Sequence, residues 1–322
     1  MFRNFHELVE AACALEPTTI AVAAGHDPDA IEALKKASSM GLADGIFIGD
    51  SERIRSLGED VGLDLSPEQI VHEAEEVAAA RAAISLIREG KASLLMKGKI
   101  GTATLIRAVL DRENGIRTDR ILSQVIVFQV PGMNRLMIMT DAAINIAPGL
   151  TQKAEICRNA IEVARAIGIE RPNVAALCAL EFVNADMPAT IDAAGLTLMN
   201  RRGQLTGAYV EGPIALDVPL SKFAADRKGI DSPLVENTDI LVAPNIEAAN
   251  MLYRAIIYFA KGESGGIVFG ARVPLILLSR AETPETKIRS IAIGKLAGNG
   301  LPRHGVKPGS VSCAEDFSEN GQ

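Results

Sequence analysis

Two adjacent residues, Ser279 and Arg280, have side chains that could take part in catalysis or ligand binding. They follow an apolar stretch and precede a predicted polar turn and helix. The surrounding segment, 265–294, reads GGIVFGARVPLILLSRAETPETKIRSIAIG. It predicts strands at 267–271 and 273–279, then a helix that Thr283 caps and Pro284 begins. The free N–H groups and the dipole of a helix N-terminus favour an anion, and arginine suits phosphate. A phosphate-bearing ligand is one interpretation; a solvated arginine beside a turn serine is the other.

A second turn that would favour anion binding is MKGKIGTAT at 96–104, again between a predicted strand and a predicted helix. Lys97, the glycines and the threonines of this turn would cradle a phosphate through backbone N–H groups and charge. Arg107 lies one turn into the helix and would point back to the same place. Such a pattern is more often an ordinary lysine–glycine turn without a ligand. We consider a phosphate site here because this is the second strand-to-helix junction of this kind in the chain.

Polar residues also end other predicted strands, in the segments 211–217 and 244–250. Asp217 and Asn245 are explained at least as well as helix caps as by ligand binding. Asp141 ends a predicted hairpin beside a polar run, where it would form the wall of a cleft.

Familiar catalytic motifs are missing or stand in the wrong context. GESGG at 262–266 fits the G-x-S-x-G pattern, but a helix precedes Ser264 and a strand follows it, the reverse of a hydrolase nucleophile elbow. We therefore expect a glycine-rich loop there. No G-x-x-x-x-G-K-[ST] occurs, and no G-x-G-x-x-G follows a predicted strand. A P-loop ATPase and a standard dinucleotide-binding protein are both disfavoured.

Composition narrows the class of protein further. The 322 residues are 48% hydrophobic and only 4% aromatic, without Trp, which suits helices packed on a parallel sheet. The net charge of −7 argues against a general nucleic-acid binder. Without a long apolar run or a leader, we expect a soluble, cytoplasmic protein with no membrane contact. The four cysteines and four histidines are scattered, which predicts reduced thiols and no metal site.

The elements that must position these residues alternate between strand and helix. We expect strands at 18–24, 43–50, 92–98, 173–180, 207–214 and 239–245, with helices at 29–40, 73–90, 102–115, 151–168, 188–203, 220–229 and 247–262. A hairpin of 123–130 and 135–141 interrupts the alternation. The last residues, from about 299, lack periodicity and are expected to form a loose tail. This pattern predicts two α/β domains with a cleft between them.

Six stretches together resemble the phosphate acetyl/butyryltransferase family. They are LLMKGKIGTATLIRAVLD, MTDAAINIAP, ALEFVNADMPATIDAAGLTLMNRRG, VEGPIALD, APNIEAANMLYR and VPLILLSRAETPETKIRSIAIG, which cover most of 92–294 in the family's order. The resemblance is closer to the butyryltransferase branch, notably in MKG, MPATIDAA and SRAETPETK. The first ninety residues match only in their βα pattern.

This resemblance implies reversible transfer of a short acyl group between coenzyme A and phosphate. Coenzyme A is then a substrate, and neither a cofactor nor a metal is needed. It further implies a homodimer or higher homo-oligomer and a two-domain fold like that of isocitrate and isopropylmalate dehydrogenases. The first domain would comprise 1–140 plus 281–322 and the second 141–280, with the substrates in the interdomain cleft. The alternatives are a non-catalytic protein that binds coenzyme A or acyl phosphate, and a dehydrogenase of similar fold.

Site residues carry over by position. Ser279 and Arg280 match the family's Ser-Arg pair and Arg107 matches an arginine of the preceding lysine–glycine helix. The family's acetyltransferases place an aspartate base shortly after the Ser-Arg pair, and this chain has none there. Glu285 is the candidate base, although the helix dipole explains a glutamate in a first turn equally well. The expected phosphate or coenzyme A contacts are Lys97, Gly98, Thr104, Arg107, Asp141, Asn245, Glu247 and Asn250.

Overall fold

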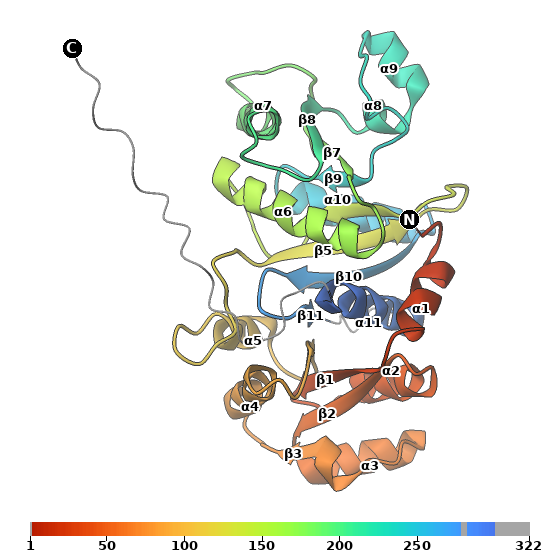
Figure 1. The fold of residues 1–322 in the computed structure, drawn as a ribbon, viewed down its shortest axis with the longest axis vertical. Helices are drawn as coiled ribbons and strands as arrows, with labels where there is room; N and C mark the ends of the chain where they lie inside the picture. The colour runs from red at the N-terminus through yellow and green to blue at the C-terminus, as the bar shows by residue number, and fades with distance from the viewer. Residues whose placement is uncertain (1, 278–281, 300–322) are drawn as a thin grey trace, which may run out of the picture.

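The computed structural model describes residues 2–277 and 282–299, which form one large mixed sheet with helices on both faces (Figure 1). The strands are β1 Thr18–Ala23, β2 Ala43–Gly49, β3 Ile70–His72, β4 Leu94–Lys97, β5 Ser123–Gln129, β6 Met137–Thr140, β7 Asn173–Leu177, β8 Tyr209–Ile214, β9 Ile240–Val242, β10 Glu263–Phe269 and β11 Leu275–Ile276. The helices are α1 Phe5–Cys13, α2 Pro28–Ser39, α3 Ser51–Val61, α4 Glu76–Arg88, α5 Thr102–Val109, α6 Leu150–Ala166, α7 Pro188–Arg201, α8 Asp217–Leu220, α9 Lys222–Lys228, α10 Ile246–Tyr258 and α11 Pro284–Asn299. The predicted α/β class is confirmed.

The sheet consists of two parallel halves that run in opposite directions. Its eleven strands follow the order β3-β2-β1-β4-β11-β10-β5-β6-β9-β7-β8. Strands β3, β2, β1, β4 and β11 are mutually parallel, as are β6, β9, β7 and β8. Antiparallel pairing of β11 with β10, β10 with β5 and β5 with β6 joins the halves. The predicted 123–141 hairpin is therefore confirmed as β5 and β6.

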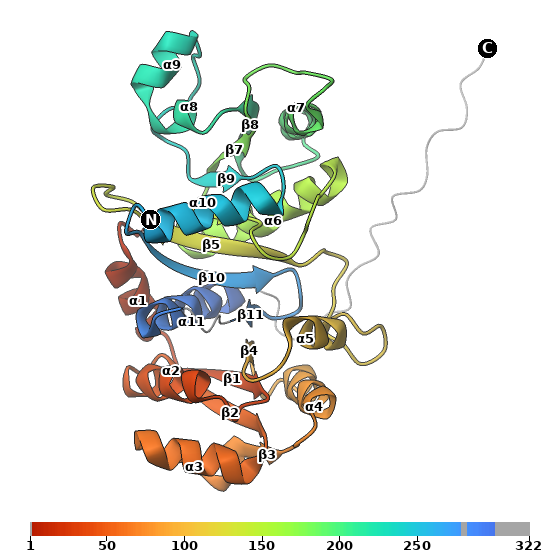
Figure 2. The ribbon, with the colours of Figure 1, turned by 180° about the vertical axis from the view of Figure 1, so that it is seen from behind.

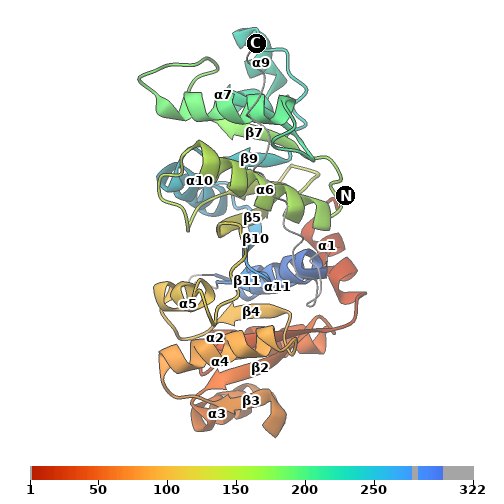
Figure 3. The ribbon, with the colours of Figure 1, turned by 60° about the vertical axis from the view of Figure 1, so that its left-hand side comes forward.

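Helices cover both faces with aliphatic side chains, as the composition predicted. Residues of α1, α2, α6, α7 and α11 share one buried cluster on the face seen in Figure 1. On the other face, seen in Figure 2, α4 and α5 cover the half that contains β1, and α10 covers the half that contains β6. The side view in Figure 3 separates α10 and α5 from α6 and α11.

The sequence interpretation was wrong or incomplete at several elements. It omitted α1, α3 and β3, and it extended the helix of α5 to 115 although that helix ends at Val109. The glycine-rich segment 262–266, expected as a loop, mostly belongs to β10 because its backbone pairs with β5 from Glu263 onward. The predicted second strand of 273–279 is only Leu275–Ile276 among the described residues. The expected tail lies outside them, apart from Asn299.

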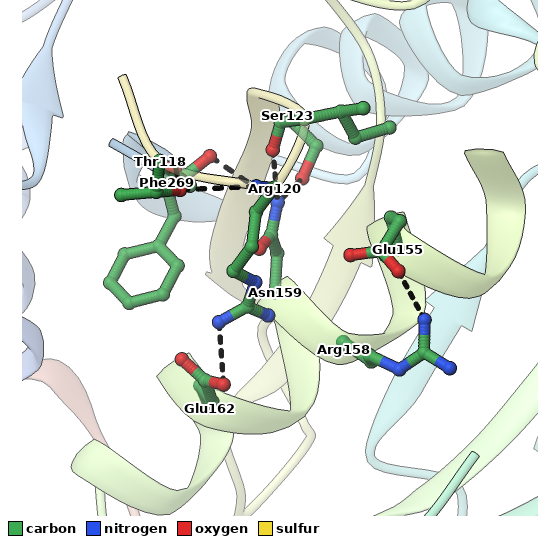
Figure 4. A network of polar contacts seen from close by, with 10 residues as sticks. Thr118, Arg120, Ser123, Glu155, Arg158, Asn159, Glu162 and Phe269 are labelled. Carbon is green, nitrogen blue, oxygen red and sulfur yellow. Dashed lines mark hydrogen bonds and ion pairs between the residues drawn. The ribbon is translucent and has the colours of Figure 1, made fainter. Parts of the chain in front are cut away.

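A buried amide fastens α6 to the strands that join the two halves. The Asn159 side chain donates hydrogen bonds to the Ile121 carbonyl at 3.0 Å, the Ser123 hydroxyl at 2.8 Å and the Phe269 carbonyl at 3.3 Å (Figure 4). Arg120, which precedes β5, pairs with Glu162 one helical turn further along α6. These contacts fix the start of β5 against the end of β10.

Within the described ranges, no helix has both the length and the apolar character needed to cross a membrane.

Candidate active site

A small pocket opens where β10 and β11 part. The two strands pair at Val268 and Leu275. The described residues that line the pocket are Gln124, Ile126, Tyr253, Gly266, Ile267, Val268, Leu277, Glu282 and Thr286. They come from β5, β10, α10, α11 and the residues on either side of 278–281. The pocket therefore lies at the carboxyl end of β11, where ligands are expected in α/β sheets.

The alternation of β10 explains the floor of this pocket. Ile267 joins the cluster on the α11 face, whereas Val268 joins the cluster on the opposite face. Gly265 faces α11 so closely that a Cβ there would lie 2.7 Å from the Cβ of Arg289. Gly266 turns the other way and contributes no side chain. The double glycine thus lets α11 pack tightly on one face and leaves space on the other.

Ser279 and Arg280, the predicted catalytic pair, lie outside the described residues. The described chain ends at Leu277 and resumes at Glu282, and both of these residues line the pocket. The helix start that follows is confirmed, because the Thr283 hydroxyl accepts a hydrogen bond from the Thr286 N–H at 3.3 Å. Pro284 begins α11 as predicted.

Glu285, the candidate base, is placed toward α2 and is not among the pocket-lining residues. Its carboxylate lies 3.4 Å from the Lys36 ammonium, and its side chain is 56% exposed. A hydrogen bond from its own backbone N–H, assisted by Lys36, lowers the pKa of Glu285. A lower pKa makes this carboxylate a weaker proton acceptor. The acidic residue that lines the pocket is Glu282, which the sequence interpretation did not select.

The lysine–glycine turn uses two of its backbone N–H groups within the sheet. The N–H groups of Gly98 and Lys99 donate to the carbonyls of Ala23 and Ala24, each at 2.9 Å. The Lys97 ammonium is 3.1 Å from the Gly98 carbonyl. These two N–H groups are unavailable to a ligand, because pairing with the end of β1 already uses them. Phosphate binding by the rest of the turn stays a prediction. A direct contact from the Lys97 side chain stays a prediction.

Thr104 and Arg107 do come together, in a groove of about 800 Å³ between α4 and α5. Its lining is Glu73, Val77, Ala78, Arg81, Ala82, Ile84, Ser85, Arg88, Thr104, Arg107, Ala108, Asp111 and Asn114. Arg81, Ser85 and Arg88 stand three and four residues apart, which places them on one face of α4. The sequence interpretation missed both of these arginines; their helical spacing was the available signal.

The three arginines of this groove carry positive charge that no ion pair neutralises among the described residues. Arg88 contacts only a neutral amide, the Asn114 side-chain oxygen, at 3.4 Å. The nearby Asp111 accepts hydrogen bonds from the backbone N–H groups of Asn114 and Glu113, which lower its pKa, with a smaller effect from the arginines. Glu73 and Asp111 line the groove as well, so three guanidinium groups face two carboxylates and the lining carries a small net positive charge. The guanidinium groups are suited to phosphate.

Asp141 is buried, and its carboxylate accepts hydrogen bonds from the loop that follows β6. One carboxylate oxygen accepts from the N–H groups of Ala143 at 3.0 Å and Ile144 at 3.1 Å. The other accepts from the backbone N–H of Asn145 at 3.0 Å and from its side chain at 2.6 Å. These four hydrogen bonds occupy the carboxylate and hold the loop in place. Ile144 then packs against the same buried cluster as Ile106 of α5 and Leu277.

The residues at the start of α10 support this loop as well. Asn245 caps the helix by accepting from the Ala248 N–H at 2.9 Å, which confirms the capping interpretation. The Asn250 side chain donates to the Ala142 carbonyl at 3.2 Å. Glu247 is exposed in the first turn. A ligand contact from any of the three stays a prediction.

The aspartates that a metal-dependent dehydrogenase would need have separate partners. Asp192 lies 2.7 Å from the Lys153 ammonium, and Asp217 lies 2.8 Å from that of Lys228. Asp141 is held by its own loop. Across 2–277 and 282–299, no group of three or more His, Cys, Asp or Glu side chains is arranged to hold a metal ion.

Comparison with known proteins identifies the family. Residues 68–294 match the model described as phosphate acetyl/butaryl transferase. The chain is 42% identical over 300 residues to phosphate butyryltransferase of Clostridium acetobutylicum, covering 93% of this chain and 100% of that protein. It is 41% identical to phosphate acetyltransferase of Rhizobium meliloti, covering 91% and 93%. The crystal structure of a branched-chain phosphotransacylase from Enterococcus faecalis V583 superposes with a TM-score of 0.75 at 32% identity, covering 87% and 99%. With the matched segment spanning the pocket and the groove, the chain belongs to the phosphate acetyl/butyryltransferase family.

Proposed function

We propose that this protein transfers a short acyl group, butyryl or acetyl, between coenzyme A and inorganic phosphate. The observation that carries the proposal is the pocket at the carboxyl end of β11, in a chain of this family. Leu277 and Glu282, which flank the segment that contains Ser279 and Arg280, both line it. The N-terminus of α11, which begins beside these residues, favours an anion such as phosphate.

The chemistry requires positioning and charge stabilisation. The coenzyme A thiol, with a pKa of ~8.5, loses its proton and attacks the acyl carbonyl, and phosphate leaves. An acyl-enzyme is unnecessary because phosphate is already a good leaving group. Burial raises the pKa of the Cys178 thiol to about 11 and of Cys157 to about 12, so these two thiols are protonated at neutral pH and poor nucleophiles.

Arg280 binds the phosphate, and Ser279 donates to the carbonyl oxygen or orients the thiol. Of the two glutamates that follow Arg280, we assign Glu282 to accept the thiol proton, because it lines the pocket and Glu285 does not. Coenzyme A is a substrate in this scheme, and the reaction needs no cofactor and no metal.

The groove between α4 and α5 binds the nucleotide end of coenzyme A. That end carries a diphosphate and a ribose 3′-phosphate, and guanidinium groups bind such oxygens bidentately. Arg81, Arg88 and Arg107 supply three of them on one surface. The apolar strip of Ala78 and Ala82 between the charged residues gives the adenine ring a surface to lie against.

The arrangement of the sheet supports the expected domain organisation. Two parallel halves of opposite direction are consistent with two α/β domains related to isocitrate and isopropylmalate dehydrogenases. The halves depart from the expected bounds of 1–140 plus 281–322 and 141–280, because β6 (Met137–Thr140) pairs in the half of β9 and β11 (Leu275–Ile276) in the half of β4. The strands that join them would form the floor of an interdomain cleft. A homodimer in the cytoplasm completes the proposal.

An acyl-CoA series tests this function. Acetyl- to hexanoyl-CoA are incubated with phosphate, and thiol release is followed. We expect turnover with at least one of these substrates. Binding of coenzyme A without thiol release, and without thiol consumption when acetyl or butyryl phosphate is supplied, would instead indicate a non-catalytic binding protein.

Replacing Arg81 and Arg88 together by alanine is expected to raise the KM for coenzyme A by about tenfold or more, since charge-assisted hydrogen bonds contribute about 1.5–3 kcal/mol. Turnover at saturation should change little, because the groove binds the ground state and the transition state alike. Steady-state kinetics in the direction of acyl-CoA formation measures both constants.

The matched control is Arg202→Ala, an exposed arginine beside α7 in the other half of the sheet. Dephospho-coenzyme A, which lacks the 3′-phosphate, separates the contacts: the double variant should lose less affinity for it than for coenzyme A. Equal KM values for wild type and double variant with both thiols would exclude the groove.

A further inference from the structure

Helix α7 is apolar on the side that faces the sheet and also on its outer side. Thr190, Ala193 and Leu196 are buried toward the sheet. Strand β8, which ends the sheet, holds the helix, because the Thr197 hydroxyl donates to the Gly212 carbonyl at 2.8 Å (Figure 1). A helix that is apolar on all sides is normally covered on all sides. The outer side of α7 is therefore a candidate interaction surface.

Four large apolar side chains are exposed on this outer side and in the loop before it. Ile191 is 50% exposed and Leu198 is 55% exposed; they stand seven residues apart on α7 and share one face. In the preceding loop, Phe182 is 61% exposed and Val183 is 58% exposed. Together they expose on the order of 400 Å², within the range of about 300–600 Å² for the largest apolar patch of a monomer, which is often functional. We call these four residues, with the half-buried Ala194 between Ile191 and Leu198, the α7 face.

Polar contacts hold the loop of the α7 face against the helix. The Asn184 N–H donates to the Thr190 hydroxyl at 2.9 Å, and that hydroxyl donates to the Asn184 carbonyl at 3.0 Å. At the other end of the loop, the Glu181 carboxylate lies 2.7 Å from the Lys228 ammonium. The two apolar residues between Glu181 and Asn184 are thus presented to solvent by an anchored segment. A surface ordered in advance favours association, because binding then costs less conformational entropy.

The charges around the α7 face favour a second copy of this chain as its partner. Within 188–200 the only charged residue is Asp192, and it is paired with the Lys153 ammonium at 2.7 Å. Exposed charges of opposite sign stand at the two ends of the helix, Asp186 before its first turn and Arg201 in its last. Neither forms an ion pair among the residues that the structure describes.

Two copies of this helix are complementary when they pack antiparallel about a twofold axis. Ile191 and Leu198 stand equally far from the middle of the helix at Ala194–Gly195, so Ile191 of each copy meets Leu198 of the other. The same axis brings the Asp186 end of each helix to the Arg201 end of the other. Apolar side chains then form the centre and opposite charges the rim, which is the usual anatomy of an interface.

We propose that the α7 face is the interface of a homodimer in which two copies pack antiparallel through α7. This proposal rests on the homodimer of the proposed function and assigns its surface. A stable interface takes about 800 Å² from each partner, so the α7 face supplies about half of it as the apolar core and the surrounding polar residues supply the rest.

Leu198→Asp tests this interface, because Leu198 is exposed in the single chain but lies in the centre of the proposed dimer. The twofold axis places two unpaired carboxylates in the apolar core, so we expect the dimer dissociation constant to rise at least about 100-fold. Sedimentation velocity at a series of protein concentrations measures this constant, and far-ultraviolet circular dichroism checks that the chain stays folded. Phe259→Asp is the matched control: Phe259 is 88% exposed beyond α10, outside the α7 face, and this variant should dimerise like wild type.

Ala194→Cys provides a second arm that does not depend on Leu198. The axis passes beside this position, so mild oxidation is expected to link two chains through the introduced thiols, which mass spectrometry of the linked peptide detects. Wild-type protein oxidised in parallel gives the background from its own cysteines.

A wild-type chain that stays monomeric, or a folded Leu198→Asp chain that dimerises like wild type, would overturn the proposal. If Leu198→Asp fails to fold, the presence or absence of the Ala194→Cys link decides. Acyl transfer is assayed separately. An active enzyme that is monomeric would overturn the interface alone, whereas an inactive dimer that meets these expectations would overturn the proposed acyl transfer alone.

Discussion

Arg280→Ala is expected to reduce kcat/KM for acyl transfer by roughly 10²-fold or more, the scale for losing one transition-state donor. A guanidinium binds two phosphate oxygens at once, and its charge stabilises the leaving group as the bond to carbon breaks. Lysine cannot reproduce the planar pair of donors, so Arg280→Lys should recover only part of the activity. Initial rates at saturating coenzyme A, over a range of acyl phosphate concentrations, give the constants.

Arg272→Ala is the appropriate control for this substitution. Arg272 is exposed in the preceding turn between β10 and β11, and its backbone N–H, which alanine retains, bonds the Ile116 carbonyl at 2.9 Å. It should behave like wild type. An Arg280→Ala enzyme with near-normal activity would remove Arg280 from the mechanism.

Gly98→Ala is expected to destabilise the fold by about 3 kcal/mol, the upper range for forcing extra atoms into a packed site. A Cβ at this position would lie 2.3 Å from the Ala24 carbonyl oxygen and 3.0 Å from that of Ala23. Both are backbone atoms of β1 and its continuation, so they cannot move aside as a flexible side chain would. Relief requires separating β4 from β1 where Gly98 and Lys99 donate to these carbonyls. Urea unfolding followed by circular dichroism measures the loss.

Gly101→Ala tests the same turn without the clash. A Cβ there would meet only the Thr104 hydroxyl, at an ordinary 3.5 Å. Its stability should fall by only about 0.5–1 kcal/mol, because Gly101 is the N-cap of α5 and alanine is a poorer N-cap than glycine. If Gly98→Ala were fully stable but lost phosphate affinity, the ligand-binding role suggested by the sequence would be correct and the close-packing role wrong.

The fold class followed from sequence because its signals are local. Strand and helix periods, and the Gly and Pro residues between them, depend on neighbours a few positions away, which is why the β5–β6 hairpin was predicted. Elements without strong Gly or Pro boundaries were missed: β3 spans only Ile70–His72, and α1 and α3 precede residue 68, where the match to the family model begins. The segment 262–266 was misassigned since its strand character comes from pairing with β5, a distant partner.

For the site, the sequence by itself determined the helix start at Thr283 and Pro284, the Asn245 cap and, through the ordered motifs, the family. The helix start and the cap depend on contacts within a few residues, and the family depends on the order of the amino-acid motifs. Only the tertiary structure decided that Gly98 is required for close packing against β1, that Arg81 and Arg88 share a groove with Arg107, and that Glu282 lines the pocket while Glu285 contacts Lys36. These relations join separate elements, and the packing of helices on the sheet, which no local pattern encodes, sets the distances between them.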